Sequence, residues 1–182
     1  MRSNLGYADY LGALQRYRAE YPRDLRLLTV SHFLINYPFA DRLFPNSLAV
    51  IDRVKKWGPA VILSDGDVVF QPRKIQHAGL WDVLHGDVLI YTHKQAMLEA
   101  MQQRYPAAHY VMVDDKPQIL IDMKQRLGDR LTTVFVRQGH YALDPEELAR
   151  YPSADVTLEH IGELAAVDPG RLSGIAAPQQ VR

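Results

Sequence analysis

The sequence has no cysteine, no long apolar run and no excess of charge of either sign, and each absence removes a class of function. Without cysteine, the 182 residues can form no disulfide, thiolate zinc site or cysteine nucleophile. No apolar run approaches the ~20 residues that cross a bilayer, and the first residues, MRSNLGYADYLGAL, lack the apolar core of a secretory signal. Lys and Arg together number 21, as do Asp and Glu, so charge favours neither nucleic acid nor a membrane as a partner. We therefore expect a soluble, cytoplasmic protein.

Apolar residues nevertheless make up 47% of the chain, which is enough for a sizeable core. After Pro45, short apolar runs alternate with segments of helical periodicity, and Gly or Pro residues separate many of them. This alternation is typical of an α/β fold with a parallel sheet. The expected strands lie within residues 60–64, 86–93, 109–115 and 131–139, the expected helices lie within 46–58, 72–80, 94–106 and 116–128, and a last short strand and helix lie within 154–164.

The two ends of the chain differ from this middle part. Apolar residues recur at helical spacing from Leu5 to about Ile35, which predicts two amphipathic helices. From residue 167 onward, VDPGRLSGIAAPQQVR contains Gly, Pro and Gln without a period, which predicts a mobile end. We therefore divide the chain into a helical segment (1–44), an α/β core (45–166) and a mobile tail (167–182).

Polar residues suited to binding phosphate and metal follow the expected strands. Parallel sheets bind ligands beyond the carboxyl ends of their strands, where this sequence places Ser64, Lys94 and the pair Asp114–Asp115. A hydroxyl and backbone N–H groups can hold phosphate oxygens, and a lysine can neutralise them. Paired carboxylates suit Mg²⁺, which takes one or two carboxylates and keeps several waters. Each residue alone could instead be a turn residue, a helix cap or a solvated side chain, so only the combination suggests phosphoryl chemistry.

Three of these segments resemble, in order, motifs of the haloacid dehalogenase-like (HAD) hydrolases. The stretch FPNSLAVIDRVKKWGPAVILSDG resembles the helix and strand that lead into the family's second motif, where the strand ends in Ser or Thr. Lys94 stands where the third-motif lysine is expected. The stretch HYVMVDDKPQILIDMKQRLGDRLTTVFVRQG resembles the fourth-motif strand, its acidic end, and the helix and strand that follow. The resemblance covers Phe44 to Gly139.

The resemblance implies a Rossmann-like, three-layer α/β core with a partial helical cap at residues 1–44. It also implies a Mg²⁺-dependent phosphatase lineage that acts on a small phosphorylated molecule. The residues implied to hold phosphate are Ser64 and Lys94, and the implied Mg²⁺ ligands are Asp114 and Asp115. Three residues beside these motifs are further candidates for contact with the substrate: Asp65, Arg73 and His93.

The stretch DGDVV after Ser64 also fits the family's first motif, Asp-x-Asp-x-Thr/Val, whose first aspartate is the nucleophile. We favour Ser64 as the second motif, because the first motif usually precedes the cap and the Pro-led helix. With Asp65 as nucleophile, Thr92 would have to be the second motif. Too little chain would then remain for a separate lysine before Asp114.

With Ser64 as the second motif, no first motif precedes it. The acidic residues before Ser64 are Asp9, Glu20, Asp24, Asp41 and Asp52, and none of them ends an apolar strand. In the family, the first-motif strand lies between the strands that end here at Ser64 and Asp114, so we expect these two strands to lack a shared neighbour. We also expect the sequence to be the C-terminal part of a longer HAD protein and to be inactive as a phosphatase by itself, because the aspartyl-phosphate route needs the nucleophile.

Two other interpretations compete with this one. A non-catalytic HAD-like protein that serves as a binding partner or scaffold would account for the missing nucleophile, and it predicts a stable fold. The stretch YVMVDDKPQILIDMKQRL also resembles the start of a response-regulator receiver domain, in which Asp155 would be the phospho-acceptor. The further apolar strand and lysine that a receiver domain needs after Asp155 are absent, so we disfavour that fold.

Overall fold

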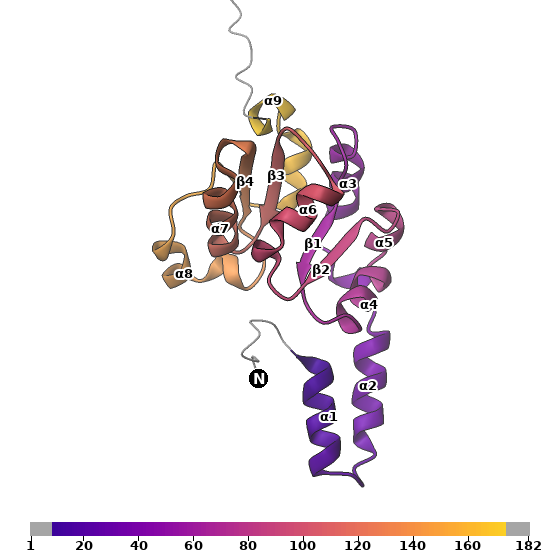
Figure 1. The fold of residues 1–182 in the computed structure, drawn as a ribbon. Coiled ribbons are helices and arrows are strands. Elements are labelled where there is room, and N and C mark those ends of the chain that lie inside the picture. Colours follow the sequence, from indigo (N-terminus) through magenta and orange to yellow (C-terminus); the bar gives the residue numbers. More distant parts are fainter. Residues whose placement is uncertain (1–8, 174–182) are drawn as a thin grey trace, which may run out of the picture. The chain divides into compact units, whose positions relative to one another are not determined.

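The computed structural model describes residues 9–173 and divides into two compact units (Figure 1). Unit 1 combines Met1–Leu43 with Ala60–Met97, and unit 2 combines Phe44–Pro59 with Leu98–Arg182. Each unit contains its own parallel sheet. Among the residues described, no helix is long and apolar enough to cross a lipid bilayer.

Unit 1 contains a two-stranded parallel sheet and a helical hairpin. Strands β1 (Ile62–Asp65) and β2 (Val88–Tyr91) pair in register, with Ser64 opposite Ile90. The hairpin helices contact each other, and α2 also packs against α4 (Figure 1). The helical elements of the unit are α1 (Tyr10–Glu20), α2 (Arg26–Asn36), η1 (Phe39–Arg42), α4 (Phe70–His77), α5 (Leu80–Val83) and η2 (Lys94–Ala96). The two helices predicted for the N-terminal segment are thereby confirmed.

Unit 2 contains a three-stranded parallel sheet in the order β3-β4-β5. The strands are β3 (Tyr110–Asp114), β4 (Leu131–Val136) and β5 (Val156–Leu158). The helical elements are α3 (Ser47–Val54), α6 (Leu98–Arg104), α7 (Pro117–Leu127), η3 (Gly128–Arg130), η4 (Tyr141–Leu143), α8 (Pro145–Arg150), η5 (Ile161–Ala166) and α9 (Pro169–Leu172). The alternation of strands and helices predicted an α/β fold with parallel strands, and the structure confirms it.

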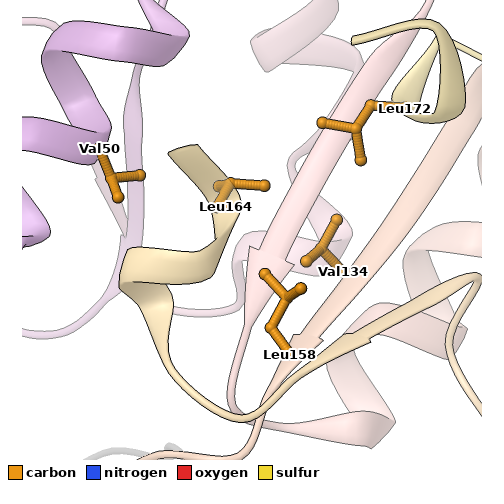
Figure 2. Close-up of a cluster of buried hydrophobic side chains, with 5 residues drawn as sticks. All are labelled: Val50, Val134, Leu158, Leu164 and Leu172. Carbon is orange, nitrogen blue, oxygen red and sulfur yellow. The ribbon is translucent and has the colours of Figure 1, made fainter. Parts of the chain in front are cut away.

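The core of unit 2 lies on both faces of β4, whose six residues are all buried. Successive side chains of a strand point to opposite faces, so Val134 and Phe135 enter different clusters. Val134 packs with Val50, Leu158, Leu164 and Leu172 (Figure 2). Phe135 packs with Leu120 of α7 and with Ala142. Helices cover both faces of this sheet, which is the three-layer arrangement expected of a Rossmann-like core.

The local sequence explains where α7 begins and ends. Pro117 occupies its first turn, where the missing N–H has no intrahelical partner to lose. Gly128 follows its last residue with φ +55° and ψ −131°, a backbone conformation that glycine adopts readily because it has no Cβ atom. The helix starts directly after the acidic end of β3, so it holds Asp114 and Asp115 at the edge of the sheet.

The structure places two segments differently from the predicted domain division. Helix α3 packs against η5 in unit 2, whereas β1 and β2 belong to unit 1 with the helical hairpin, so the segment 45–166 is divided between the units. The predicted mobile tail also starts too early, because α9 contributes Leu172, which is 2% exposed, to the core of unit 2. Residues 174–182 of that tail lie outside the described residues.

Each sheet lies within its own unit. Within residues 9–173, β1 pairs only with β2, and β3 pairs only with β4 and no other strand. That the strands ending at Ser64 and Asp114 lack a shared neighbour stays a prediction.

Candidate functional site

The carboxyl ends of β1 and β2 bring together three of the predicted residues in unit 1. Ser64 and Asp65 end β1, and Lys94 begins the short helix η2 after β2. The backbone N–H of Lys94 donates a hydrogen bond to Oδ1 of Asp65 over 2.6 Å. The Lys94 ammonium donates to the carbonyl oxygen of Leu63 over 3.3 Å, and the residue is only 8% exposed. A buried ammonium group needs polar partners, and here it lies at the strand end that carries the serine hydroxyl.

The Ser64 hydroxyl has one short and one long hydrogen bond. The side-chain amide of Gln71, on α4, donates from Nε2 to Ser64 Oγ over 2.7 Å. Ser64 Oγ in turn donates to the carbonyl oxygen of Asp65 over 3.3 Å. Sequence reasoning singled out Ser64 but missed Gln71, because nothing in the helix pattern marks a glutamine that turns back to the strand end.

The two aspartates of the stretch DGDVV hold the local backbone. Oδ1 of Asp65 accepts the Lys94 N–H and so connects the end of β1 to the loop after β2. Oδ1 of Asp67 accepts hydrogen bonds from the N–H groups of Val69 (2.9 Å) and Phe70 (2.7 Å), where α4 begins. Carboxylates in such capping positions satisfy the free N–H groups of a helix start. Both side chains therefore have partners in the local backbone.

The remaining predicted substrate contacts, Arg73 and His93, lie in the same unit. Arg73 is on α4, and its Nε atom is buried without a hydrogen-bond partner among the described residues. His93 is exposed and immediately precedes η2. Both positions remain predictions for contact with a substrate.

The acidic pair lies at the carboxyl end of β3 in unit 2. Both carboxylates are half-buried, and the N–H of Lys116 donates to Oδ1 of Asp114 over 3.0 Å. Burial raises the pKa of Asp115 to about 6, and the neighbouring charge of Asp114 adds to the increase while Lys116 opposes it. Two carboxylates that are held close in a partly buried place repel each other, and a divalent cation would relieve that repulsion.

A glycine in the loop after β4 makes room for the Asp115 carboxylate. Gly139 has φ +91°, and a Cβ atom built on it would lie 2.5 Å from Oδ2 of Asp115. The ammonium of Lys116 lies over the ring of Tyr141, 4.2 Å from its centroid. The sequence placed the loop at this end of the sheet but could not show that Gly139 approaches the carboxylate.

The donor set of the acidic pair suits Mg²⁺. Among the described residues, no group of three or more His, Cys, Asp or Glu side chains gathers around a common point. Mg²⁺ binds through one or two carboxylate oxygens and keeps its other ligands as water. Asp114 and Asp115 supply hard oxygen ligands of that number.

A cavity of about 360 Å³ lies elsewhere in unit 2, and none of the predicted site residues lines it. Its walls come from α7, the strands β4 and β5, and the segment before β5. Asp155 in that wall precedes β5 and accepts hydrogen bonds from Thr133 and Lys124. A phospho-acceptor would be expected at the carboxyl end of a strand, so the position of Asp155 agrees with the rejection of a receiver domain.

No protein-family model matches the chain, and neither does any curated protein. Among solved structures, the chain is similar to a crystal structure assigned as a haloacid dehalogenase-like hydrolase from Burkholderia xenovorans LB400. The two sequences are 63% identical, the TM-score is 0.85, and the match covers 90% of this chain and 76% of that one.

Proposed function

Since the chain belongs to the haloacid dehalogenase-like hydrolases, we propose that it comes from a Mg²⁺-dependent phosphatase lineage acting on a small phosphorylated substrate. The observation that carries the proposal is the hydrogen bond between the Lys94 N–H and Asp65 Oδ1. It fixes a buried lysine at the end of β1, next to the Ser64 hydroxyl. A fixed cation and a hydroxyl at the carboxyl ends of two parallel strands are suited to phosphoryl oxygens.

In this proposal, unit 1 supplies the groups that hold phosphate. The Lys94 ammonium neutralises phosphoryl oxygens, and because it is buried its attraction for an anion is screened less than that of a surface lysine. The Ser64 hydroxyl donates a hydrogen bond to one of these oxygens, and the backbone N–H of Asp65 donates a second one. Arg73 and His93 contact the rest of the substrate.

Unit 2 supplies the groups that hold the metal. Asp114 and Asp115, at the carboxyl end of β3, would hold Mg²⁺ through carboxylate oxygens. Asp115 must release its proton before it can bind a cation, and its raised pKa makes this release depend on pH near neutrality.

We further propose that the 182-residue chain does not turn over phosphate esters by itself. Phosphoryl transfer by the family's route needs an aspartate nucleophile, and with Ser64 as the second motif none of the acidic residues before it follows an apolar strand. A non-catalytic binding or scaffold protein is the competing possibility, and it would not need Ser64 and Lys94 to bind phosphate.

The test measures phosphate binding and turnover on the same purified chain. We expect calorimetry to detect binding of inorganic phosphate, and Lys94→Met to weaken it roughly tenfold or more because a charge-assisted bond is lost. Lys74→Met, which removes an exposed lysine on α4, is the matched control and should bind phosphate as the wild type does. With Mg²⁺ added, p-nitrophenyl phosphate should be hydrolysed no faster than in buffer.

Two results would contradict these proposals separately. Strong Mg²⁺-dependent hydrolysis that is lost in Lys94→Met would disprove the proposed inactivity but support the phosphatase lineage. If the wild type does not bind phosphate, or if Lys94→Met binds it equally well, unit 1 does not hold phosphate as proposed. Either result would favour the non-catalytic scaffold protein.

A further inference from the structure

We infer that Gln71 is a positioning residue that orients the Ser64 hydroxyl so that its proton is donated to an oxygen of a bound phosphoryl group. The inference rests on the proposed function, because it takes Ser64 as a phosphate-holding residue. It adds a residue on α4 that acts through Ser64 and that no sequence motif marks.

The direction of the hydrogen bonds carries the inference. A serine oxygen has one proton to donate and two lone pairs to accept with, whereas an amide NH₂ group can only donate. The 2.7 Å bond from Gln71 Nε2 therefore occupies a lone pair of Ser64 Oγ and turns the hydroxyl proton away from Gln71. The proton points to the carbonyl oxygen of Asp65 over 3.3 Å, which is longer than the roughly 2.5–3.0 Å of a good O–H···O bond. Exchanging this weak acceptor for a phosphoryl oxygen therefore costs the hydroxyl little hydrogen-bond free energy.

The packing around Gln71 keeps its side chain in place. A Cβ atom built on Gly66 would lie 2.8 Å from Cβ and 2.9 Å from Cγ of Gln71, so the glycine lets the stem of Gln71 lie directly on the turn after β1. That turn is held to β2 by the 3.0 Å bond from Gly66 N–H to the Tyr91 carbonyl oxygen. Asp67 holds the start of α4 through two N–H groups. An orienting group on a fixed helix loses little conformational freedom when the ligand binds.

A double-mutant cycle with inorganic phosphate as the probe tests the inference. Gln71→Met keeps the length of the side chain and removes its N–H donors. We expect it to weaken phosphate binding roughly 3- to 10-fold, the loss that corresponds to one ordinary hydrogen bond. In a Ser64→Ala background the same substitution should change the affinity less than about twofold, because the group it orients is gone. Gln76→Met, an exposed position on the same helix, is the matched control and should bind phosphate normally.

The possible results separate this inference from the proposed function. If Ser64→Ala weakens binding and Gln71→Met does not, the inference is wrong and the phosphate role of Ser64 stands. If Gln71→Met weakens binding equally in both backgrounds, Gln71 acts only through general structure and the inference is wrong. If the wild type does not bind phosphate, or if Ser64→Ala binds phosphate as well as the wild type does, the inference about Gln71 and the proposed phosphate role of Ser64 are both wrong.

A measurement on the wild type decides the matter if Gln71→Met does not fold. In a ¹⁵N–¹H spectrum, the side-chain amide signals of Gln71 should shift as phosphate is added, because the hydroxyl that accepts their hydrogen bond changes its own acceptor. The side-chain signals of Gln76 should not move. Unchanged Gln71 signals at saturating phosphate would overturn the inference.

Discussion

At the scale of single residues, the chemistry of Asp115 depends on its surroundings. Burial and the charge of Asp114 raise its pKa to about 6, so below that pH the folded protein holds a proton where Mg²⁺ would bind. The carboxylate has room because the facing loop residue, Gly139, has no side chain. If the acidic pair holds Mg²⁺ as proposed, its affinity for the cation should therefore depend on pH.

We predict that the affinity for Mg²⁺ falls roughly tenfold per pH unit as the pH decreases below about 6, because a proton competes with the metal for Asp115. Above that pH the affinity should become constant. Calorimetric titration of the chain with Mg²⁺ at pH 5, 6 and 7 measures this dependence. Asp115→Asn should lose most of the affinity, while Asp122→Asn, one turn along α7, should keep the wild-type affinity and pH dependence. A constant affinity from pH 5 to 7 in the wild type would contradict the prediction.

At the scale of elements, Asp155 connects three parts of unit 2. Its Oδ2 atom accepts hydrogen bonds from the N–H and hydroxyl of Thr133 on β4 (2.8 and 2.9 Å) and from the ammonium of Lys124 on α7 (2.9 Å). Its own N–H donates to the Thr133 hydroxyl over 3.0 Å. Burial alone would raise the pKa of Asp155, but these hydrogen bonds outweigh it and lower the pKa. The carboxylate thus ties the short edge strand β5 to the centre of its sheet.

We predict that Asp155→Asn lowers the free energy of unfolding by about 1–2 kcal/mol at pH 7, because hydrogen bonds to a charged acceptor become neutral ones and part of the gain is screened by solvent. A folded-state pKa below the unfolded value makes this contribution complete above the ordinary aspartate pKa of about 4 and lost as the pH falls through the lowered pKa. Urea unfolding at pH 7 and near pH 3.5 measures the difference.

For this comparison Asp129→Asn is the control. Asp129 is exposed in η3, so this variant should have the same free energy of unfolding as the wild type. A difference between wild type and Asp155→Asn that is as large near pH 3.5 as at pH 7 would show that the charge of Asp155 is not its cause.

At the scale of the whole molecule, each unit gathers segments that are far apart in the sequence. Unit 2 joins residues 44–59 to the second half of the chain, and Val50 of α3 belongs to the same buried cluster as Leu164 and Leu172 (Figure 2). The last described helix, α9, is therefore part of the core although its sequence contains Gly and Pro in a non-periodic stretch. Asp168 caps this helix by accepting the Gly170 N–H over 2.9 Å.

We predict that Leu172→Ala lowers the free energy of unfolding by about 2–4 kcal/mol, because the side chain is 2% exposed and its removal leaves a cavity in the core. Leu143→Ala is the control, since Leu143 is 69% exposed and its truncation should cost less than about 0.5 kcal/mol. Urea unfolding followed by circular dichroism measures both. Equal stability of Leu172→Ala and the wild type would show that α9 does not contribute to the core in solution.

The order of the strands β1–β5 and of the helices α1–α4, α6 and α7 could be predicted from the sequence alone, because hydrophobic periodicity and the positions of Gly and Pro are local signals. The helices α8 and α9 were not predicted. The sequence also placed Ser64 and Lys94 at the carboxyl ends of β1 and β2, and Asp114 at that of β3, because residues that follow parallel strands lie at one edge of their own sheet. Their roles in binding stay predictions. The sequence could not show the hydrogen bond from Gln71 to Ser64, or the approach of Gly139 to Asp115. These contacts depend on how loops and helices pack in three dimensions. Burial is likewise a property of the folded chain, so only the tertiary structure decided the raised pKa of Asp115 and the place of Leu172 in the core.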